Sequence, residues 1–183
     1  MALDTHYFIG IYVPDHVAHK IEQDIRTKSG LYFQKWTAPS DYHVTLVFLG
    51  AIADEPLCHV TKLLDQTASQ IAAFPLEIQH LGIFGTAERP RVFFAEPNEN
   101  KALMMLREKI KQAVLQTGHP VEARPFHPHM TIARKWTAEE PYVEEASLHE
   151  KPYTFQVSEF VLYQICPKET PRYKPLKRFI LHN

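Results

Sequence analysis

The sequence predicts a mixed α/β or α+β fold with two sheets, each covered by helices on one side. The expected elements follow one another as strand, helix, strand, helix, strand, strand, helix, strand, short helix, strand, strand. This order neither alternates throughout nor separates strands from helices, which favours two sheets over one doubly wound sheet. Two apolar strand patterns also begin with the same His-x-Thr triplet at similar places in the two halves. The triplets suggest an internal duplication, although no long repeat is visible.

Turn-forming residues and apolar periodicity divide the first half of the chain into strands, helices and one loop. Asp15 and Asp54 are each expected to cap a helix. The expected segments are a strand over Tyr7–Val13, a helix with Val17, Ile21 and Ile25 on one face, a loop around Trp36–Asp41, a strand over His43–Gly50, and a helix with Leu57, Val60, Leu64 and Ala68 on one face.

The second half reads in the same way, with more strands. The turn-forming segment Gly85–Pro90 separates two strands, and Gly118 ends a helix. The expected segments are strands over Leu76–Phe84 and Arg91–Glu96, a helix from about Asn98 with Leu103, Leu106, Ile110 and Val114 as its apolar stripe, the second His-x-Thr strand, a short helix around Ala138–Ser147, and strands over Tyr153–Tyr163 and Lys177–His182.

The composition of the 183 residues is that of an ordinary globular protein with a sizeable core, at 45% hydrophobic and 22% charged residues. The formal net charge of −1 lacks the basic excess of most nucleic-acid binders. Cys58 and Cys166 form no CxxC pair, which argues against a disulfide framework and favours a reducing compartment. No signal-peptide pattern opens the sequence, and no apolar run approaches the ~18 residues that span a bilayer. We expect a cytoplasmic protein with no membrane association.

The two His-x-Thr triplets place polar side chains on one face of an apolar strand. Alternate residues of a strand share a face, so His43 and Thr45 project together, as do His129 and Thr131. The intervening residues, Val44, Leu46, Phe48, Met130 and Ile132, are expected to pack into the core behind them. Burying such a polar face without partners would be costly. The four polar side chains are therefore expected to line a cleft.

Two imidazoles and two hydroxyls around a cleft suit one kind of chemistry. Imidazole titrates near pH ~6.5, so one ring can accept a proton while the other donates one. Threonine hydroxyls can donate hydrogen bonds to anionic oxygens. Together they could support in-line attack on a phosphodiester without a metal. A strained cyclic phosphate suits this mechanism best.

Other patterns carry less weight. His127 and His129 lie two apart and could form a metal pair, but neither cysteine nor a helical His pair accompanies them and no carboxylate lies nearby in sequence. The sequence therefore predicts no metal site. The tail is locally basic, which indicates either a small basic patch or an ordinary solvated face. Its basic residues are Lys168, Arg172, Lys174, Lys177 and Arg178.

The paired triplets resemble the two H-x-[ST]-x motifs that define the 2H phosphoesterase superfamily. The sequence is most similar to the RNA 2′,3′-cyclic phosphodiesterase (ThpR/LigT) family. The resemblance covers nearly the whole chain: YFIGIYVP, WTAPSDYHVTLVFLG, RPRVFFAE, FHPHMTIAR and the tyrosine-bearing tail. It implies a single bilobal α+β domain over residues 1–183. Each lobe would be an antiparallel sheet flanked by helices on its outer side, with a central cleft between pseudo-duplicated lobes.

The resemblance also implies an activity and roles for particular residues. The activity is hydrolysis of RNA terminal 2′,3′-cyclic phosphate to a 2′-phosphomonoester, with no metal or other cofactor. His43 matches the proton donor and His129 the proton acceptor, an assignment that comes from the resemblance alone. Thr45, Thr131 and Arg134 match the phosphate-binding residues. Strict strand alternation would place Arg134 opposite to His129, so its role requires a bulge or a strand end there.

Two alternatives stay open. The same chemistry could act on small cyclic nucleotides, or the chain could be a non-catalytic module that binds RNA ends. Reverse joining through a 2′–5′ linkage is chemically allowed and is expected to be minor. The expected partner is RNA with a cyclic phosphate end, and the protein is expected to be a monomer. Phe48 and Tyr173 match aromatic positions of the family, and Phe48 is expected in the core.

Overall fold

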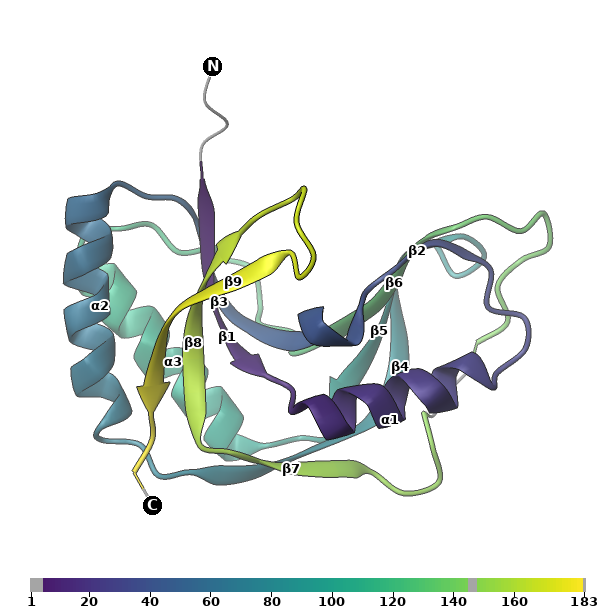
Figure 1. Ribbon diagram of the computed structural model, residues 1–183, viewed down its shortest axis with the longest axis horizontal. Helices are drawn as coiled ribbons and strands as arrows, with labels where there is room; N and C mark the ends of the chain where they lie inside the picture. Colours follow the sequence, from purple (N-terminus) through teal and green to yellow (C-terminus); the bar gives the residue numbers. More distant parts are fainter. Residues whose placement is uncertain (1–4, 145–147, 183) are drawn as a thin grey trace.

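The protein has two antiparallel sheets, as a computed structural model of residues 5–144 and 148–182 shows (Figure 1). The first sheet runs in the order β3 (His43–Ala51), β1 (His6–Tyr12), β8 (Glu159–Ile165), β9 (Tyr173–Ile180). The second sheet runs in the order β2 (Phe33–Trp36), β6 (Met130–Trp136), β5 (Pro90–Pro97), β4 (Phe74–Gly85), β7 (Tyr153–Val157). Neighbouring strands within each sheet are antiparallel throughout.

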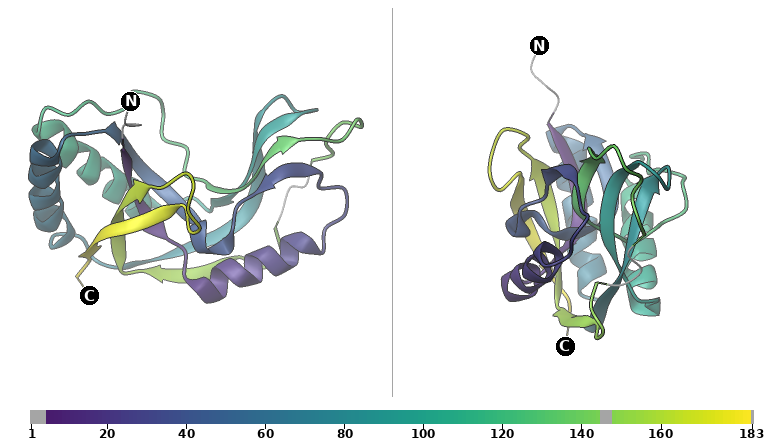
Figure 2. Two further views of the ribbon diagram at one scale, coloured as in Figure 1. Left: turned by 45° about the horizontal axis from the view of Figure 1, so that its top comes forward. Right: turned by 90° about the vertical axis from the view of Figure 1, so that its right-hand side faces the viewer.

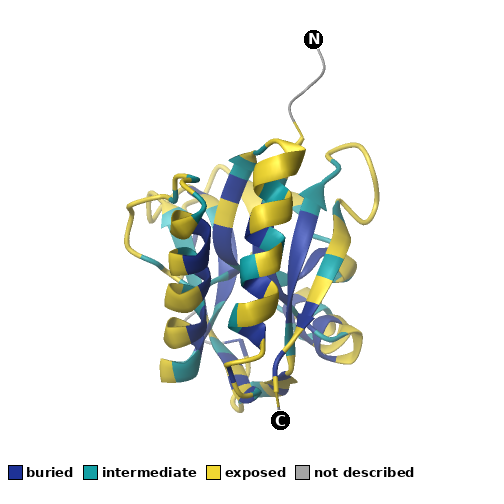
Figure 3. Cartoon of the chain, turned by 90° about the vertical axis from the view of Figure 1, so that its left-hand side faces the viewer, coloured by how far each residue is buried: buried dark blue, intermediate teal, exposed yellow. Residues whose placement is uncertain are grey.

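Helices accompany both sheets. α2 (Asp54–Ala68) and α3 (Lys101–Gln116) pack on each other and contact β9 and β3 of the first sheet. α1 (Asp15–Arg26) contacts β7 of the second sheet and the short 3₁₀ turn Pro39–Asp41. Seen from the side of α2 and α3, the outward helix faces are exposed and the inward faces buried (Figure 3). The predicted α+β fold of two antiparallel sheets with helices is confirmed.

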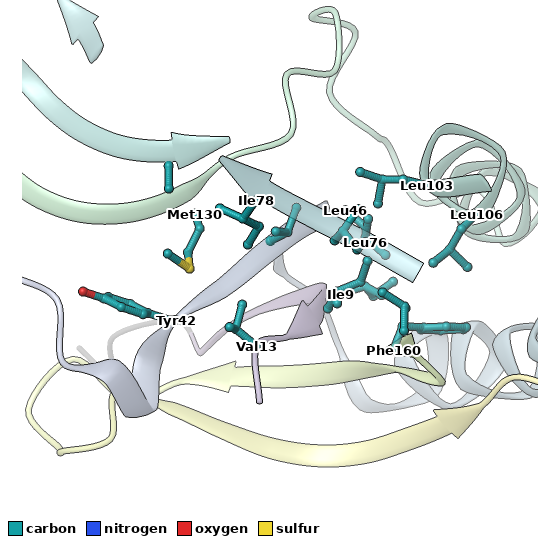
Figure 4. Packing of buried hydrophobic residues seen from close by; sticks show 14 of the residues in the cluster. Ile9, Val13, Tyr42, Leu46, Leu76, Ile78, Leu103, Leu106, Met130 and Phe160 are labelled. Atoms are coloured by element: carbon teal, nitrogen blue, oxygen red, sulfur yellow. The ribbon is translucent and has the colours of Figure 1, made fainter. Parts of the chain in front are cut away.

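One buried apolar cluster joins the two sheets (Figure 4). Its members include Ile9 and Leu46 from the first sheet, Ile78 and Met130 from the second, and Leu106 from α3. All five are at most 3% exposed. Because this packing lies directly behind both His-x-Thr triplets, it fixes the spacing between β3 and β6.

Several element boundaries differ from the sequence-based expectation. No strand was expected directly before the loop around Trp36–Asp41, but residues 33–36 form the edge strand β2, which pairs with β6. The single strand expected over Tyr153–Tyr163 is two strands of different sheets, β7 and β8, separated at Ser158. The final strand starts at Tyr173 and not at Lys177.

The short helix expected around Ala138–Ser147 is absent from residues 138–144, and residues 145–147 lie outside the described residues. Pro141 explains the difference, because a proline lacks the donor that a helix interior needs. Tyr142 instead packs its ring against Trp136, with centroids 5.5 Å apart. The helix caps also differ. Asp15 and Asp54 are the first helical residues, without a side-chain cap bond, whereas the Asn100 side chain accepts a hydrogen bond from the Leu103 amide at 2.9 Å.

Candidate active site

A cleft of about 590 Å³ lies between the two sheets, and we refer to it as the central cleft. His43 and Thr45 reach it from β3, and Thr131 and Arg134 from β6, with His129 just before β6 begins. Side chains from the β2–β3 connection and from the loop 166–172 between β8 and β9 complete its wall. These two connections lie on the same side of the molecule (Figures 1 and 2). The structure thus brings all five predicted site residues into one cavity.

The backbone orients both imidazoles in the same way. The Nδ1 atom of His43 lies 2.7 Å from the carbonyl oxygen of Asp41, and Nδ1 of His129 lies 2.8 Å from that of His127. A carbonyl oxygen can only accept, so each Nδ1 carries a hydrogen and donates it. Each Nε2 atom is then left for other partners, and that of His43 lies 3.1 Å from Thr45 Oγ1. In both triplets the carbonyl two residues upstream sets the tautomer.

Aromatic rings surround His43. The centroids of Phe8 and Tyr173 each lie 4.7 Å from that of the imidazole. Burial lowers the pKa of His43 to about 4, and the nearby positive charges of His129 and Arg134 act in the same direction. The hydrogen bond to the Asp41 carbonyl acts against this shift.

His129 has a comparable environment in the second sheet. Its ring lies 4.9 Å from Phe84 and 5.3 Å from Phe94, centroid to centroid. Burial lowers the pKa of His129, and the charges of His127 and Arg134 add to the effect, whereas the His127 carbonyl and Glu96 oppose it. Burial therefore favours the neutral form of both imidazoles.

A β-bulge in β6 brings Arg134 to the cleft. Along β5, Phe94 lies opposite Thr131 and the next residue, Phe93, lies opposite Ala133, so Ile132 is an extra residue in the ladder. Both Ile132 and Ala133 are buried. One extra residue reverses the alternation of faces, which puts Arg134 on the same side as Thr131. The bulge that this placement requires is present.

The first triplet carries a bulge at the equivalent position. Gly10 of β1 lies opposite Thr45 while Ile9 lies opposite Val47, so Leu46 is the extra residue. The reversal turns Phe48 toward the central cleft, where it is 48% exposed. The expectation that Phe48 packs in the core was wrong, because it assumed unbroken alternation. Phe48 and Arg134 stand at matching positions after the two threonines.

Asp41 links His43 to the loop between β8 and β9, a role that no motif in the sequence predicted. Its side chain is only 4% exposed and accepts hydrogen bonds from the backbone amides of Arg172 at 2.9 Å and Tyr173 at 3.4 Å. Burial raises the pKa of Asp41, and the two amide hydrogen bonds oppose that shift. Its place two residues before His43 was the one signal in the sequence.

Four of the five basic residues of the tail fall into two groups. Lys168 and Arg172 line the central cleft. Lys177 instead pairs with Asp65 across to α2, and Arg178 pairs with Glu159 on β8. The cleft wall therefore receives part of the local positive charge, together with Arg134.

His127 and His129 do not share a common ligand position. Nε2 of His127 lies 2.9 Å from a carboxylate oxygen of Glu96, and the two imidazole centroids are 6.3 Å apart. Within residues 5–144 and 148–182, no three His, Cys, Asp or Glu side chains gather as a metal-ligand set. Both cysteines are free thiols. The described part of the chain also has no helix long and apolar enough to cross a membrane.

Comparisons with known proteins agree on one family. A family model described as the 2′-5′ RNA ligase superfamily matches residues 13–166. An RNA 2′,3′-cyclic phosphodiesterase of Bacillus subtilis (strain 168) is 41% identical over 176 residues, 96% of each chain. One of Geobacillus stearothermophilus is 36% identical over 97% of this chain, which spans 57% of that longer relative.

The fold has a counterpart among solved structures. The crystal structure of E. coli LigT complexed with 3′-AMP superposes with a TM-score of 0.83, over 98% of this chain and 99% of that one, at 23% identity. Sequence identity of 23% supports only the similarity of fold. The family model and the relatives decide membership: the chain belongs to the 2′-5′ RNA ligase superfamily, that is, to the 2H phosphoesterases.

Proposed function

We propose that the protein is an RNA 2′,3′-cyclic phosphodiesterase that opens the cyclic phosphate to a 2′-phosphomonoester without a metal. The observation that carries the proposal is the pair of imidazoles, both held as Nδ1–H tautomers, lining one cleft with two hydroxyls and a guanidinium. Relatives named for the same activity support it. An acid, a base and donors for the phosphate oxygens are what this hydrolysis requires.

The proposed reaction assigns one proton transfer to each histidine. His129 Nε2 takes a proton from water as the water oxygen attacks phosphorus. The P–O3′ bond breaks on the opposite side, and His43 Nε2 gives its proton to O3′. Thr45, Thr131 and Arg134 donate to the non-bridging oxygens, where a planar guanidinium is well suited to bind two at once. The products are a 3′-hydroxyl and a 2′-phosphate, and exchange with solvent restores both rings.

The acid must be protonated before it can act, although burial favours neutral His43. A bound phosphodiester supplies the negative charge that stabilises an imidazolium, since an opposite charge within about 4–6 Å favours the charged form. Substrate binding is therefore expected to draw a proton onto the cleft. The resemblance to the family supports His43 as the residue that holds it.

A substrate with sulfur in place of the bridging O3′ tests this assignment. Thiolate leaves without protonation, so the substrate no longer needs an acid. With the oxygen substrate, His43→Ala and His129→Ala should each lose about 10²–10⁴-fold in kcat. With the sulfur substrate, His43→Ala should recover most of its loss and His129→Ala should not. If His129→Ala instead recovered its activity on the sulfur substrate, His129 would be the acid and His43 the base.

The activity itself is tested with a short oligonucleotide ending in a 2′,3′-cyclic phosphate, incubated in the presence of EDTA. Conversion to the 2′-phosphate despite chelation is the expected result. A 3′-phosphate product would contradict the proposed bond cleavage, and EDTA-sensitive turnover would contradict metal independence. Turnover of a cyclic mononucleotide alone would favour the small-nucleotide alternative.

We further propose that the enzyme acts as a monomer in the cytoplasm. All five site residues come from one chain, which supports a monomer. Two free thiols suit a reducing compartment. Size-exclusion chromatography with light scattering at assay concentrations should give the mass of one chain, 21.2 kDa. A dimer mass would contradict the proposal.

A further inference from the structure

A second cavity of about 550 Å³ opens from the central cleft. It lies between β3, the turn joining β4 to β5, and the segment 121–127 that leads to the second triplet. The two cavities share Thr45, Phe48 and His129 as wall residues. Three arginines line the second cavity, so we call it the arginine chamber: Arg91, Arg107 and Arg124.

Arg107 is the most informative residue of the chamber. It lies on α3 one position after the buried Leu106, and its side chain is only 11% exposed. Its guanidinium stands over the ring of Phe126, 5.2 Å from the centroid. Nε is buried and has no hydrogen-bond partner among the described residues. Its contact with Glu108 is 3.4 Å long, at the limit of a hydrogen bond.

A nearly buried guanidinium with an unused hydrogen-bond donor would be stabilised by binding an anion. Removing a cation from water is costly unless a negative group compensates. The chamber supplies little compensation, because its one lining carboxylate, Glu122, already pairs with Arg124. Arg91 forms no ion pair within the described part of the chain and is exposed. The wall therefore has an excess of positive charge and free guanidinium donors.

Aromatic rings lie beside these arginines. Phe84 and Phe126 line the chamber, and Phe48 stands at its boundary with the central cleft. Guanidinium groups bind phosphate oxygens in pairs, and aromatic faces accept stacked bases. Phosphate and base together are the chemistry of a nucleotide in a single strand. A free phosphate ion would use the arginines but not the rings.

We propose that the arginine chamber binds the nucleotide that precedes the cyclic-phosphate end, so that the enzyme selects oligonucleotides over cyclic mononucleotides. This inference rests on the proposed function, because it takes the cyclic phosphate to lie between His43 and His129. The chamber opens directly beside His129, so a strand anchored at the central cleft can continue into it without crossing the protein.

The test compares kcat/KM for a cyclic mononucleotide and for a short oligonucleotide with the same terminal nucleotide. The preference of the native protein for the oligonucleotide should fall about tenfold in Arg107→Met, the loss of one charge-assisted contact, and at least tenfold in the double variant Arg91→Gln, Arg124→Gln. Lys109→Gln is the matched control, since Lys109 is exposed on α3 outside the chamber. It should keep the native ratio.

Salt dependence gives a second readout. For single strands, log K changes by about 0.7 per decade of salt for each phosphate contact. A plot of log KM for the oligonucleotide against log salt concentration should therefore be less steep in the arginine variants. In Lys109→Gln it should have the same slope as in the native protein. An equal loss on both substrates, or no loss on either, would overturn the chamber as a strand subsite. A loss confined to the joining of a second strand would assign the chamber to that strand and would also overturn the proposal.

Binding separates this inference from the proposed function. Fluorescence anisotropy with a labelled single strand that already ends in a 2′-phosphate requires no turnover. Weaker binding in the arginine variants than in Lys109→Gln supports the chamber, even if the native protein hydrolyses no cyclic phosphate. Equal binding in all variants overturns it, even if hydrolysis is rapid.

Discussion

His43 and His129 are both surrounded by aromatic rings that favour the neutral imidazole. An acid–base pair is active when one ring is charged and the other is neutral. The acid fails as pH rises through its pKa, and the base fails as pH falls through its pKa. The pKa of His43 is lowered to about 4, and that of His129 is also lowered. Both the rising and the falling side of the pH–rate profile should therefore shift toward lower pH.

The pH profile of kcat/KM, which reports the free enzyme, should therefore be bell-shaped with its maximum between about 4 and the ordinary imidazole value of ~6.5. The maximum of kcat should lie at higher pH, because the bound anion raises the pKa of the ring that carries the proton. Initial rates on a cyclic mononucleotide across this range provide the measurement. A kcat/KM maximum above pH 7 would contradict the predicted shifts.

Asp41 is expected to act as a positioning residue for His43 and the loop 166–172. Asp41→Ala leaves the amides of Arg172 and Tyr173 without their acceptor, which should cost about 1–3 kcal/mol in the free energy of unfolding and lower kcat. Asp41→Asn keeps an acceptor oxygen and should retain more of both. Urea unfolding and steady-state kinetics on the two variants test this. Equal loss in both would show that the charge, and not the acceptor, is required.

The pKa of Asp41 also predicts how the difference in stability between Asp41→Asn and the native protein changes with pH. Because burial raises the pKa of Asp41, the native state binds a proton at this carboxyl more tightly than the unfolded chain does. The stability contributed by Asp41 is fully present below its unfolded pKa and is lost as pH rises through the native value. Asparagine does not titrate. The stability of Asp41→Asn relative to the native protein should therefore increase with pH from about 4 upward.

At the scale of elements, the bulge in β3 exchanges the environments of Val47 and Phe48 relative to a regular strand. Val47 is 3% exposed and Phe48 is 48% exposed. Val47→Ala should cost about 1–3 kcal/mol in the free energy of unfolding. Phe48→Ala should cost about 1 kcal/mol or less while raising KM. Chemical denaturation with substrate titration measures both, and the reverse order of stabilities would show that β3 alternates regularly.

The same bulges separate the features that the sequence predicts from those that it does not. The helices, most strands and the paired triplets follow from periodicity and turn residues, because these signals are local. The extra residues Leu46 and Ile132 look like any apolar strand residue, so their register is decided by the neighbouring strands. The break at Ser158 is likewise invisible, because strand-forming residues continue on both sides of it. Asp41 gains its role from amides about 130 positions away.

At the scale of the whole molecule, the shared core leads us to propose that residues 1–183 unfold as one unit. Both tryptophans, Trp36 and Trp136, belong to the second sheet, so their fluorescence reports that lobe. Far-ultraviolet circular dichroism reports both lobes. Thermal or urea transitions followed by the two probes should coincide. Separate midpoints would show that the lobes unfold independently.

The strand order of the first sheet also has a consequence for synthesis on the ribosome. β1 pairs with β3, close behind it in the chain, and with β8, which emerges from the ribosome much later than β3. All five strands of the second sheet and the His129 triplet emerge before β8 does. The His43 wall, with its β8–β9 loop, is therefore the last part of the cleft to be assembled. A nascent chain is therefore expected to have no complete cleft until both β8 and β9 have left the exit tunnel.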